Sequence, residues 1–115
     1  MKESELWQTV KRGLESRYPA MHLCRVENSS GSGMPDVAAC YLGREAWIEL
    51  KVMRGGRLVF GNSQRVWAAR HREAGGRAFV LARKDDTLYL YDTHALMQLP
   101  IIPVKAGSFA VATFA

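Results

Sequence analysis

The first apolar residues of the chain recur at the spacing of one helical face. They are Leu6, Trp7, Val10 and Leu14. Ser4 stands ahead of them as an N-cap, and Tyr18 followed by Pro19 ends the pattern. The pattern predicts an amphipathic helix, and the looser alternation of residues 21–27 predicts a strand after it.

Two apolar runs in the middle of the chain have the length and composition of buried strands. They cover residues 36–42 and 46–52, and the intervening Gly43, Arg44 and Glu45 are short enough for a hairpin. The segment 28–35 ahead of them is rich in glycine and serine, which is typical of a surface loop.

The second half of the chain repeats the change from helix to strand. A second helix is predicted from Ser63, as its cap, to Gly75, and one of its faces includes Gln64, Trp67, Ala68 and His71. Residues 77–82 and 87–91 are then predicted as strands joined by a hairpin, followed by a short helix near residues 93–99.

The predicted order of elements is helix, three strands, helix and two strands. This order is typical of a mixed α/β domain built on one central sheet flanked by helices. At 115 residues the chain fits a single hydrophobic core, so we assign residues 1–115 to one domain.

The charge balance adds a hint about the partner. Sixteen lysines and arginines against eleven acidic residues give a net charge of +5. This excess favours a polyanion such as nucleic acid, although many basic proteins bind none.

The cysteines and the hydropathy of the chain indicate a compartment. Cys24 and Cys40 lie in apolar surroundings without a CxxC spacing, which favours reduced core thiols over a disulfide or a zinc site. The N-terminal residues lack the apolar run of a signal peptide, and no stretch of about 18 apolar residues offers a membrane span. We therefore expect a cytoplasmic protein without a membrane partner.

The strand predicted over residues 46–52 carries charge on one face. Its alternation gives an apolar face with Ile48, Leu50 and Val52, and a second face with Trp47, Glu49 and Lys51. Asp36 opens the neighbouring strand directly after Pro35, which has no backbone donor. A hairpin between the two strands would bring the Asp36 carboxylate close to Glu49.

Two neighbouring carboxylates repel each other unless a cation lies between them. Mg²⁺ takes oxygen ligands and keeps positions open for water and phosphate oxygens. A bound metal activates water and stabilises charge on a phosphoryl group, and a nearby ammonium assists. The pattern therefore fits phosphodiester hydrolysis. The commoner structural reading is that Asp36 caps a turn and that Glu49 pairs with Lys51 on a solvated edge strand.

The combination of Pro35-Asp36 with Glu49-Leu50-Lys51 resembles the motif of the PD-(D/E)XK nuclease superfamily. The order of a helical glutamate, GxPD, GxxxWIELK, SQxxW and a GG before a strand is similar to the VRR-NUC branch and to small phage-encoded nucleases related to it. This similarity covers roughly residues 3–82. It implies a restriction-endonuclease-like αβββαβ core.

The resemblance also implies roles for individual residues. Asp36 and Glu49 would ligate Mg²⁺ or Mn²⁺, together with the backbone carbonyl of Leu50. Lys51 would be the catalytic lysine, and Gln64 would face the active site and help to hold nucleic acid or water.

A glutamate of the first helix often completes the metal site through a water molecule in this superfamily. Glu5 is the candidate here, followed by Glu3. An exposed glutamate near a helix N-terminus is explained equally well by its interaction with the helix dipole.

Together these features predict a metal-dependent DNA endonuclease of phage or prophage origin. The alternatives are a restriction or repair nuclease with the same core, and a non-catalytic basic DNA-binding module whose acidic residues are structural. One metal site cuts one strand, so paired incisions need two sites related by symmetry. We therefore expect a homodimer acting on branched DNA, the four-way Holliday junction in particular. The apolar tail from Pro100 either forms part of its interface or packs on its own sheet.

Overall fold

The structure, a computed structural model, describes residues 3–26, 33–53, 58, 60–84 and 87–93. Its elements in chain order are α1 (Glu3–Arg17), β1 (His22–Arg25), β2 (Val37–Tyr41), β3 (Arg44–Val52), α2 (Asn62–Glu73), β4 (Ala78–Lys84) and β5 (Thr87–Asp92). The predicted order of helix, three strands, helix and two strands is confirmed. None of the helices in these ranges is long and apolar enough to cross a membrane.

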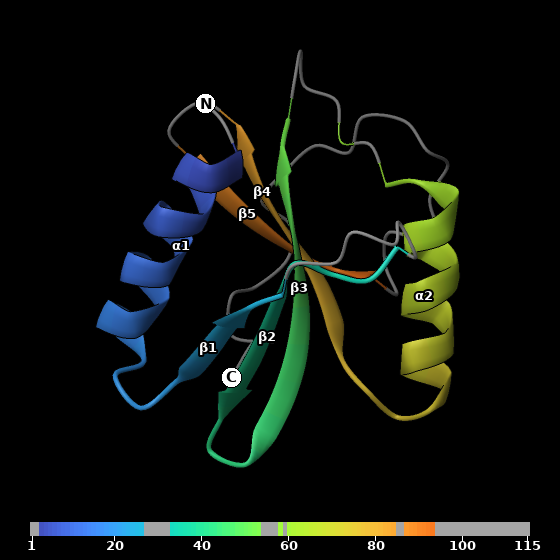
Figure 1. Ribbon diagram of the computed structural model, residues 1–115, viewed down its shortest axis with the longest axis horizontal. Coiled ribbons are helices and arrows are strands. Elements are labelled where there is room, and N and C mark those ends of the chain that lie inside the picture. The colour runs from blue at the N-terminus through green and yellow to red at the C-terminus, as the bar shows by residue number, and fades with distance from the viewer. Residues whose placement is uncertain (1–2, 27–32, 54–57, 59, 85–86, 94–115) are drawn as a thin grey trace.

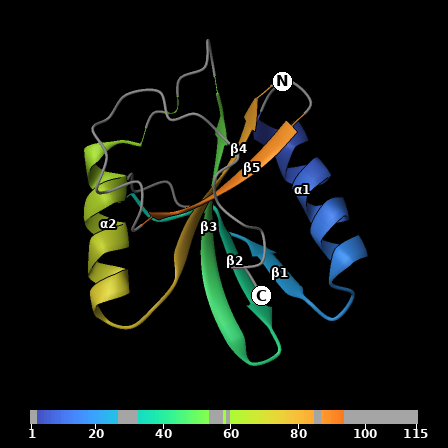
Figure 2. The ribbon, with the colours of Figure 1, turned by 180° about the vertical axis from the view of Figure 1, so that it is seen from behind.

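The five strands form one sheet in the order β1-β2-β3-β4-β5. β3 and β4 run parallel and all other neighbours run antiparallel, so α2 is the crossover that connects the parallel pair. α1 and α2 lie on opposite faces of the sheet (Figure 1), and the view from behind shows the same layers (Figure 2). The predicted mixed α/β class, with a central mixed sheet flanked by helices, is therefore confirmed.

Three predictions concern residues that the structure does not describe. The short helix near residues 93–99 lies almost entirely beyond the described range, and so does the apolar tail from Pro100. The assignment of residues 1–115 to one domain therefore stays a prediction.

Several predicted boundaries are wrong. Ser4 does not cap the first helix, because α1 already begins at Glu3. The hairpin between β2 and β3 turns at Leu42 and Gly43, one residue earlier than expected, because both residues have the positive φ that a two-residue turn requires (52° and 76°). Ser63 lies inside α2 and does not cap it. The cap is Gly61, whose N–H donates to Oε1 of Gln64 at 2.9 Å.

The side chains of β3 alternate between two packed layers. Ile48 and Leu50 are fully buried and pack in one cluster with Leu6 and Val10 of α1. On the other face, Ala68 is the buried residue of α2, and it packs with side chains of β4 and β5. The polar face of β3 is therefore the one that α2 covers.

Gly33 holds the loop before β2 against the start of α2. Its φ is +79°, in the left-handed region, and a β-carbon at this position would lie 2.3 Å from the carbonyl oxygen of Ser63. Only glycine allows the two backbones to approach so closely. The contact fixes the position of Asp36, three residues later, relative to the first turn of α2.

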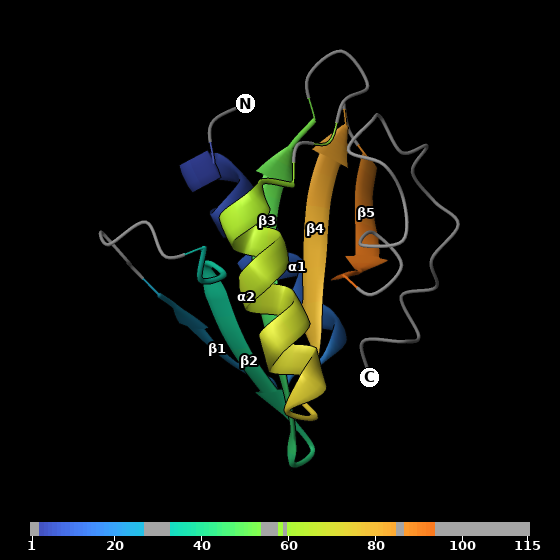
Figure 3. The same cartoon turned by 90° about the vertical axis from the view of Figure 1, so that its right-hand side faces the viewer.

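The predicted core location of the cysteines is wrong for Cys24. Both thiols are free, but Cys24 is exposed on β1 and Cys40 is half-buried on β2. The reason is that β1 is an edge strand on a part of the sheet that α2 does not cover (Figure 3).

The Gly33 contact gives the first prediction. We expect Gly33→Ala to lower the free energy of unfolding by clearly more than the matched control Gly43→Ala. Both positions have a left-handed backbone, where a β-carbon costs about 1–2 kcal/mol. A β-carbon at Gly43 meets open space, whereas one at Gly33 overlaps the Ser63 backbone. Urea unfolding followed by circular dichroism measures both losses, and equal losses would mean that the Gly33 loop can leave α2 without cost.

Candidate active site

Asp36 ends the hydrogen-bonded ladder between β2 and β3. Val37 pairs with Ile48, and continuing this register by two residues places Pro35 opposite Leu50. Proline has no N–H to offer to the Leu50 carbonyl. The Leu50 N–H donates to Oδ2 of Asp36 at 2.9 Å. The Asp36 carboxylate thus binds the backbone of β3 at the position where proline offers no donor to the Leu50 carbonyl.

Glu49 occupies the neighbouring position on β3 and is buried, with 6% of its surface exposed. Its Oε2 accepts a short hydrogen bond from Nε2 of Gln64 and lies 3.5 Å from Nζ of Lys51. Its Oε1 is buried and has no hydrogen-bond partner among the described residues. A buried oxygen without a donor is costly, so a ligand or a proton is expected there.

The surroundings of Glu49 favour its neutral form. Burial raises the pKa of Glu49 from 4.5 to about 8, and the negative charge of Asp36 adds to the effect. A protonated Glu49 can also donate a hydrogen bond to Asp36, while Lys51 acts in the opposite direction. The raised pKa therefore favours a proton on the Glu49 carboxyl at neutral pH when no cation is bound.

Gln64 connects the start of α2 to this carboxylate. Its Oε1 accepts from the Gly61 N–H at 2.9 Å, and its Nε2 donates to Glu49. The amide is held at both ends, so it fixes the orientation of the Glu49 carboxylate. The structure places Gln64 against Glu49, and its predicted role in holding nucleic acid or water stays a prediction. The hydrogen bond from Gly61 to Gln64 was not predicted. The sequence indicates it only through a glycine that directly precedes the second helix.

Lys51 lies on the same face of β3, as the alternation predicted. Its side chain is 22% exposed and its ammonium reaches Oε2 of Glu49 at 3.5 Å. The structural reading of these two residues assumed a solvated edge strand, but β3 is a central strand between β2 and β4. An ordinary surface ion pair therefore does not describe this site.

The glutamates of the first helix lie on a different layer. Glu5 is exposed on α1, which covers the face of the sheet opposite to α2 and Gln64 (Figure 1). The side chain of Glu3 is outside the described part of the structure. Their proposed contact with a metal through water stays a prediction.

The donor atoms at this edge fit a hard divalent cation. Within the described residues, no group of three or more His, Cys, Asp or Glu side chains is arranged to hold a metal ion. Two carboxylates and one backbone carbonyl still suffice for Mg²⁺, which completes its shell with water and phosphate oxygens. The candidate ligand atoms of these three described residues are all oxygens, whereas Zn²⁺ prefers imidazole and thiolate ligands. The unpartnered Oε1 of Glu49 is the atom that such an ion would satisfy.

Comparison with known proteins supports the fold. No family model and no curated protein matches the chain. Among solved structures, the chain is similar to Hjc of Archaeoglobus fulgidus, a Holliday junction resolvase from an archaeal hyperthermophile, with a TM-score of 0.59. The two chains are 17% identical over 76% of this chain and 77% of the other. The expected restriction-endonuclease-like architecture is compatible with this neighbour, while the VRR-NUC branch and the phage origin stay predictions.

Proposed function

We propose that this protein is a metal-dependent endonuclease that hydrolyses phosphodiester bonds in DNA. The observation that carries the proposal is the buried Oε1 of Glu49, which has no donor among the described residues and belongs to a carboxyl group that interacts with Asp36. The other oxygen of Glu49 is held by Lys51 and Gln64. The fold similarity to a Holliday junction resolvase supports the same class of reaction.

Each residue of the site has a role in this proposal. Asp36, Glu49 and the Leu50 carbonyl would hold Mg²⁺ or Mn²⁺. When bound, the ion lowers the pKa of a coordinated water and stabilises charge on the phosphoryl group. Lys51 would bring its partly exposed ammonium to the phosphate, where it neutralises the developing charge. Gln64 keeps Glu49 in one orientation, so that Oε1 points toward the ion.

Branched DNA is the substrate that we propose, cut by a homodimer. The described part of one chain offers one such site, and cutting two strands at a junction requires a second site related by two-fold symmetry. The net charge of +5 favours binding along several phosphates.

Cleavage assays test the reaction and its lysine. Plasmid, linear duplex and four-way junction DNA should be cut with Mg²⁺ or Mn²⁺ and left intact with EDTA. Lys51→Ala should slow turnover by about two orders of magnitude or more, because it removes a group that stabilises charge in the transition state. DNA binding and the melting temperature should hardly change.

Lys11→Ala is the matched control for this substitution, since Lys11 is a half-exposed lysine of α1 that forms an ion pair with Glu15 of the same helix. It should keep wild-type turnover. Substantial activity in Lys51→Ala would remove the lysine from the mechanism, and wild-type protein inert on all three DNAs would favour a non-catalytic DNA-binding module.

The raised pKa of Glu49 predicts a pH dependence of stability and of metal binding. Between pH 4.5 and about 8 the folded state holds a proton on Glu49 that the unfolded state has lost. The free energy of unfolding of the metal-free protein should therefore fall as pH rises through this window, by at most about 1.4 kcal/mol per pH unit for one proton. Mg²⁺ must displace the proton, so its affinity should rise toward pH 8.

Urea unfolding and calorimetry at several pH values measure both effects. In Glu49→Gln the free energy of unfolding should no longer show this part of the fall with rising pH. Both Glu49→Gln and Asp36→Asn should bind Mg²⁺ more weakly than the wild type. Glu73→Gln, at an exposed position of α2, is the control and should behave like the wild type. A strongly destabilised metal-free Glu49→Gln would instead support a purely structural role for the carboxylate.

The dimer and the junction are tested together. Light scattering should show a dimer at working concentrations, because two symmetric sites are needed for paired incisions. Four-way junctions should be cut faster than linear duplexes of the same sequence in the same buffer. A monomer that cuts both DNAs equally would contradict both parts of this proposal.

A further inference from the structure

On the face of the sheet that carries the candidate site, the described helices leave one part without a covering element. α2 runs over β3 and β4 and leaves β1 and β2 to one side (Figure 3). A hollow of about 130 Å³ lies on this open part. The side chains around it include His22, Cys24, Ala38, Cys40, Glu45 and Trp47.

The hollow adjoins the two carboxylates along the strands. Ala38 pairs with Trp47, and this cross-strand pair is the next one on the same face after Asp36 and Glu49. Two residues along a strand span about 6.6–6.8 Å. A DNA strand with one phosphate at the carboxylates would therefore carry a neighbouring nucleotide over the hollow.

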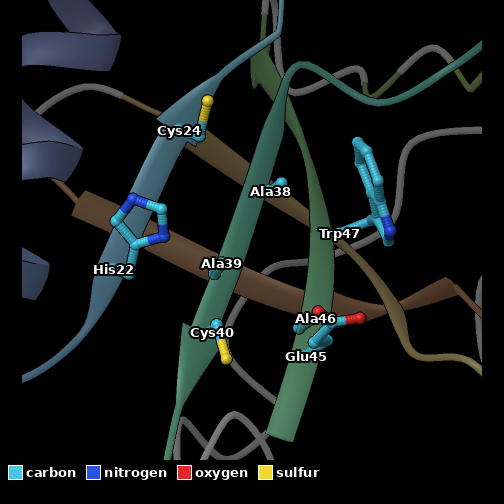
Figure 4. A pocket seen from close by; sticks show the side chains of 8 residues that line it. All are labelled: His22, Cys24, Ala38, Ala39, Cys40, Glu45, Ala46 and Trp47. Carbon is cyan, nitrogen blue, oxygen red and sulfur yellow. The ribbon is translucent and has the colours of Figure 1, made fainter.

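The walls and floor of the hollow have a composition that suits a flat, uncharged group. Figure 4 shows the Trp47 indole on one side and the His22 imidazole on the other, with the small side chains of Ala38 and Cys40 between them. Glu45 is the acidic residue of the lining and disfavours a phosphate there.

The Trp47 ring is held in place by neighbouring rings in the ligand-free protein. The Trp67 ring lies edge to face with Trp47 at 5.6 Å, and His71 stacks on Trp67 at 4.7 Å. An aromatic ring that is already fixed by its neighbours loses little conformational freedom when a base packs on it.

We propose that this hollow binds one unpaired nucleobase of the DNA substrate, next to the phosphate that is cut. The inference rests on the proposed nuclease function and extends it to the choice of substrate. A base inside a regular duplex must first be unstacked and unpaired, whereas a single-stranded flap offers unpaired bases and a branch point interrupts the continuous stack, which lowers this cost. The hollow thus supplies a preference for branched DNA that belongs to each chain and needs no second subunit.

The cysteines provide a direct measurement, because the chain has two and both line the hollow. Alkylation by iodoacetamide, read by mass spectrometry in EDTA, therefore reports on the hollow without any cleavage. Saturating four-way junction should slow the alkylation of Cys24 clearly more than an equally bound linear duplex does, because a base enters the hollow instead of passing over it. Unchanged alkylation with bound junction would overturn the proposal. Slow alkylation of both thiols in the DNA-free protein would also overturn the proposal, since the chain itself or a second copy would then fill the hollow.

A filling substitution tests the effect on cleavage. Ala38→Leu should cut the junction about ten-fold more slowly, the scale of losing one stacked base. The wild type should cut a junction with an abasic nucleotide beside the cut more slowly than an intact junction. The Ala38→Leu variant should cut the two junctions at the same rate. Ala69→Leu, the same change at an exposed position of α2, should match the wild type. Wild-type rates and selectivity in a folded Ala38→Leu would contradict the proposal.

Different results would refute the nuclease function and the base-binding hollow. A wild-type protein that cuts no DNA with Mg²⁺ or Mn²⁺ would refute the nuclease function. Normal cleavage that is insensitive to Ala38→Leu would refute only the base-binding hollow. If Ala38→Leu lowers the melting temperature, the alkylation measurement on the unmodified protein decides.

Discussion

The burial of Glu49 on a central strand is the constraint on which the rest of the site depends. A carboxylate with 6% exposure is costly unless its charge and its oxygens are compensated. The chain compensates one oxygen with two side chains, Lys51 and Gln64, and leaves the other without a described donor next to Asp36. One oxygen of the Glu49 carboxylate is thus satisfied by the protein itself, and the other is open to a proton or a cation.

The sequence was sufficient for those parts of the structure that follow from local pattern. Leu6 and Val10 predicted the buried face of α1, and the alternation in β3 separated Leu50 from Glu49 and Lys51 correctly. Side-chain periodicity determines such faces directly, so no tertiary information is needed for them.

The parts that could not be predicted depend on contacts between distant segments. Gly33 looks like an ordinary loop glycine in the sequence, and its importance comes from the Ser63 backbone thirty residues later. The exposure of Cys24 could not be foreseen either, because it depends on which strands α2 covers. The proximity of Asp36 and Glu49 could be predicted from the sequence because a hairpin is a local structure. Their metal and substrate depend on more than local structure and are proposals.

The topology of the sheet also orders the assembly of the site during folding. Asp36 reaches the Leu50 N–H within one hairpin, which closes over a short loop. Gln64 lies outside this hairpin and reaches Glu49 from α2, so its hydrogen bond needs a second element docked on the sheet. A chain with only the hairpin in place carries both carboxylates but lacks the amide that orients Glu49. The complete constellation therefore requires the docked helix, and a chain without it does not possess the site.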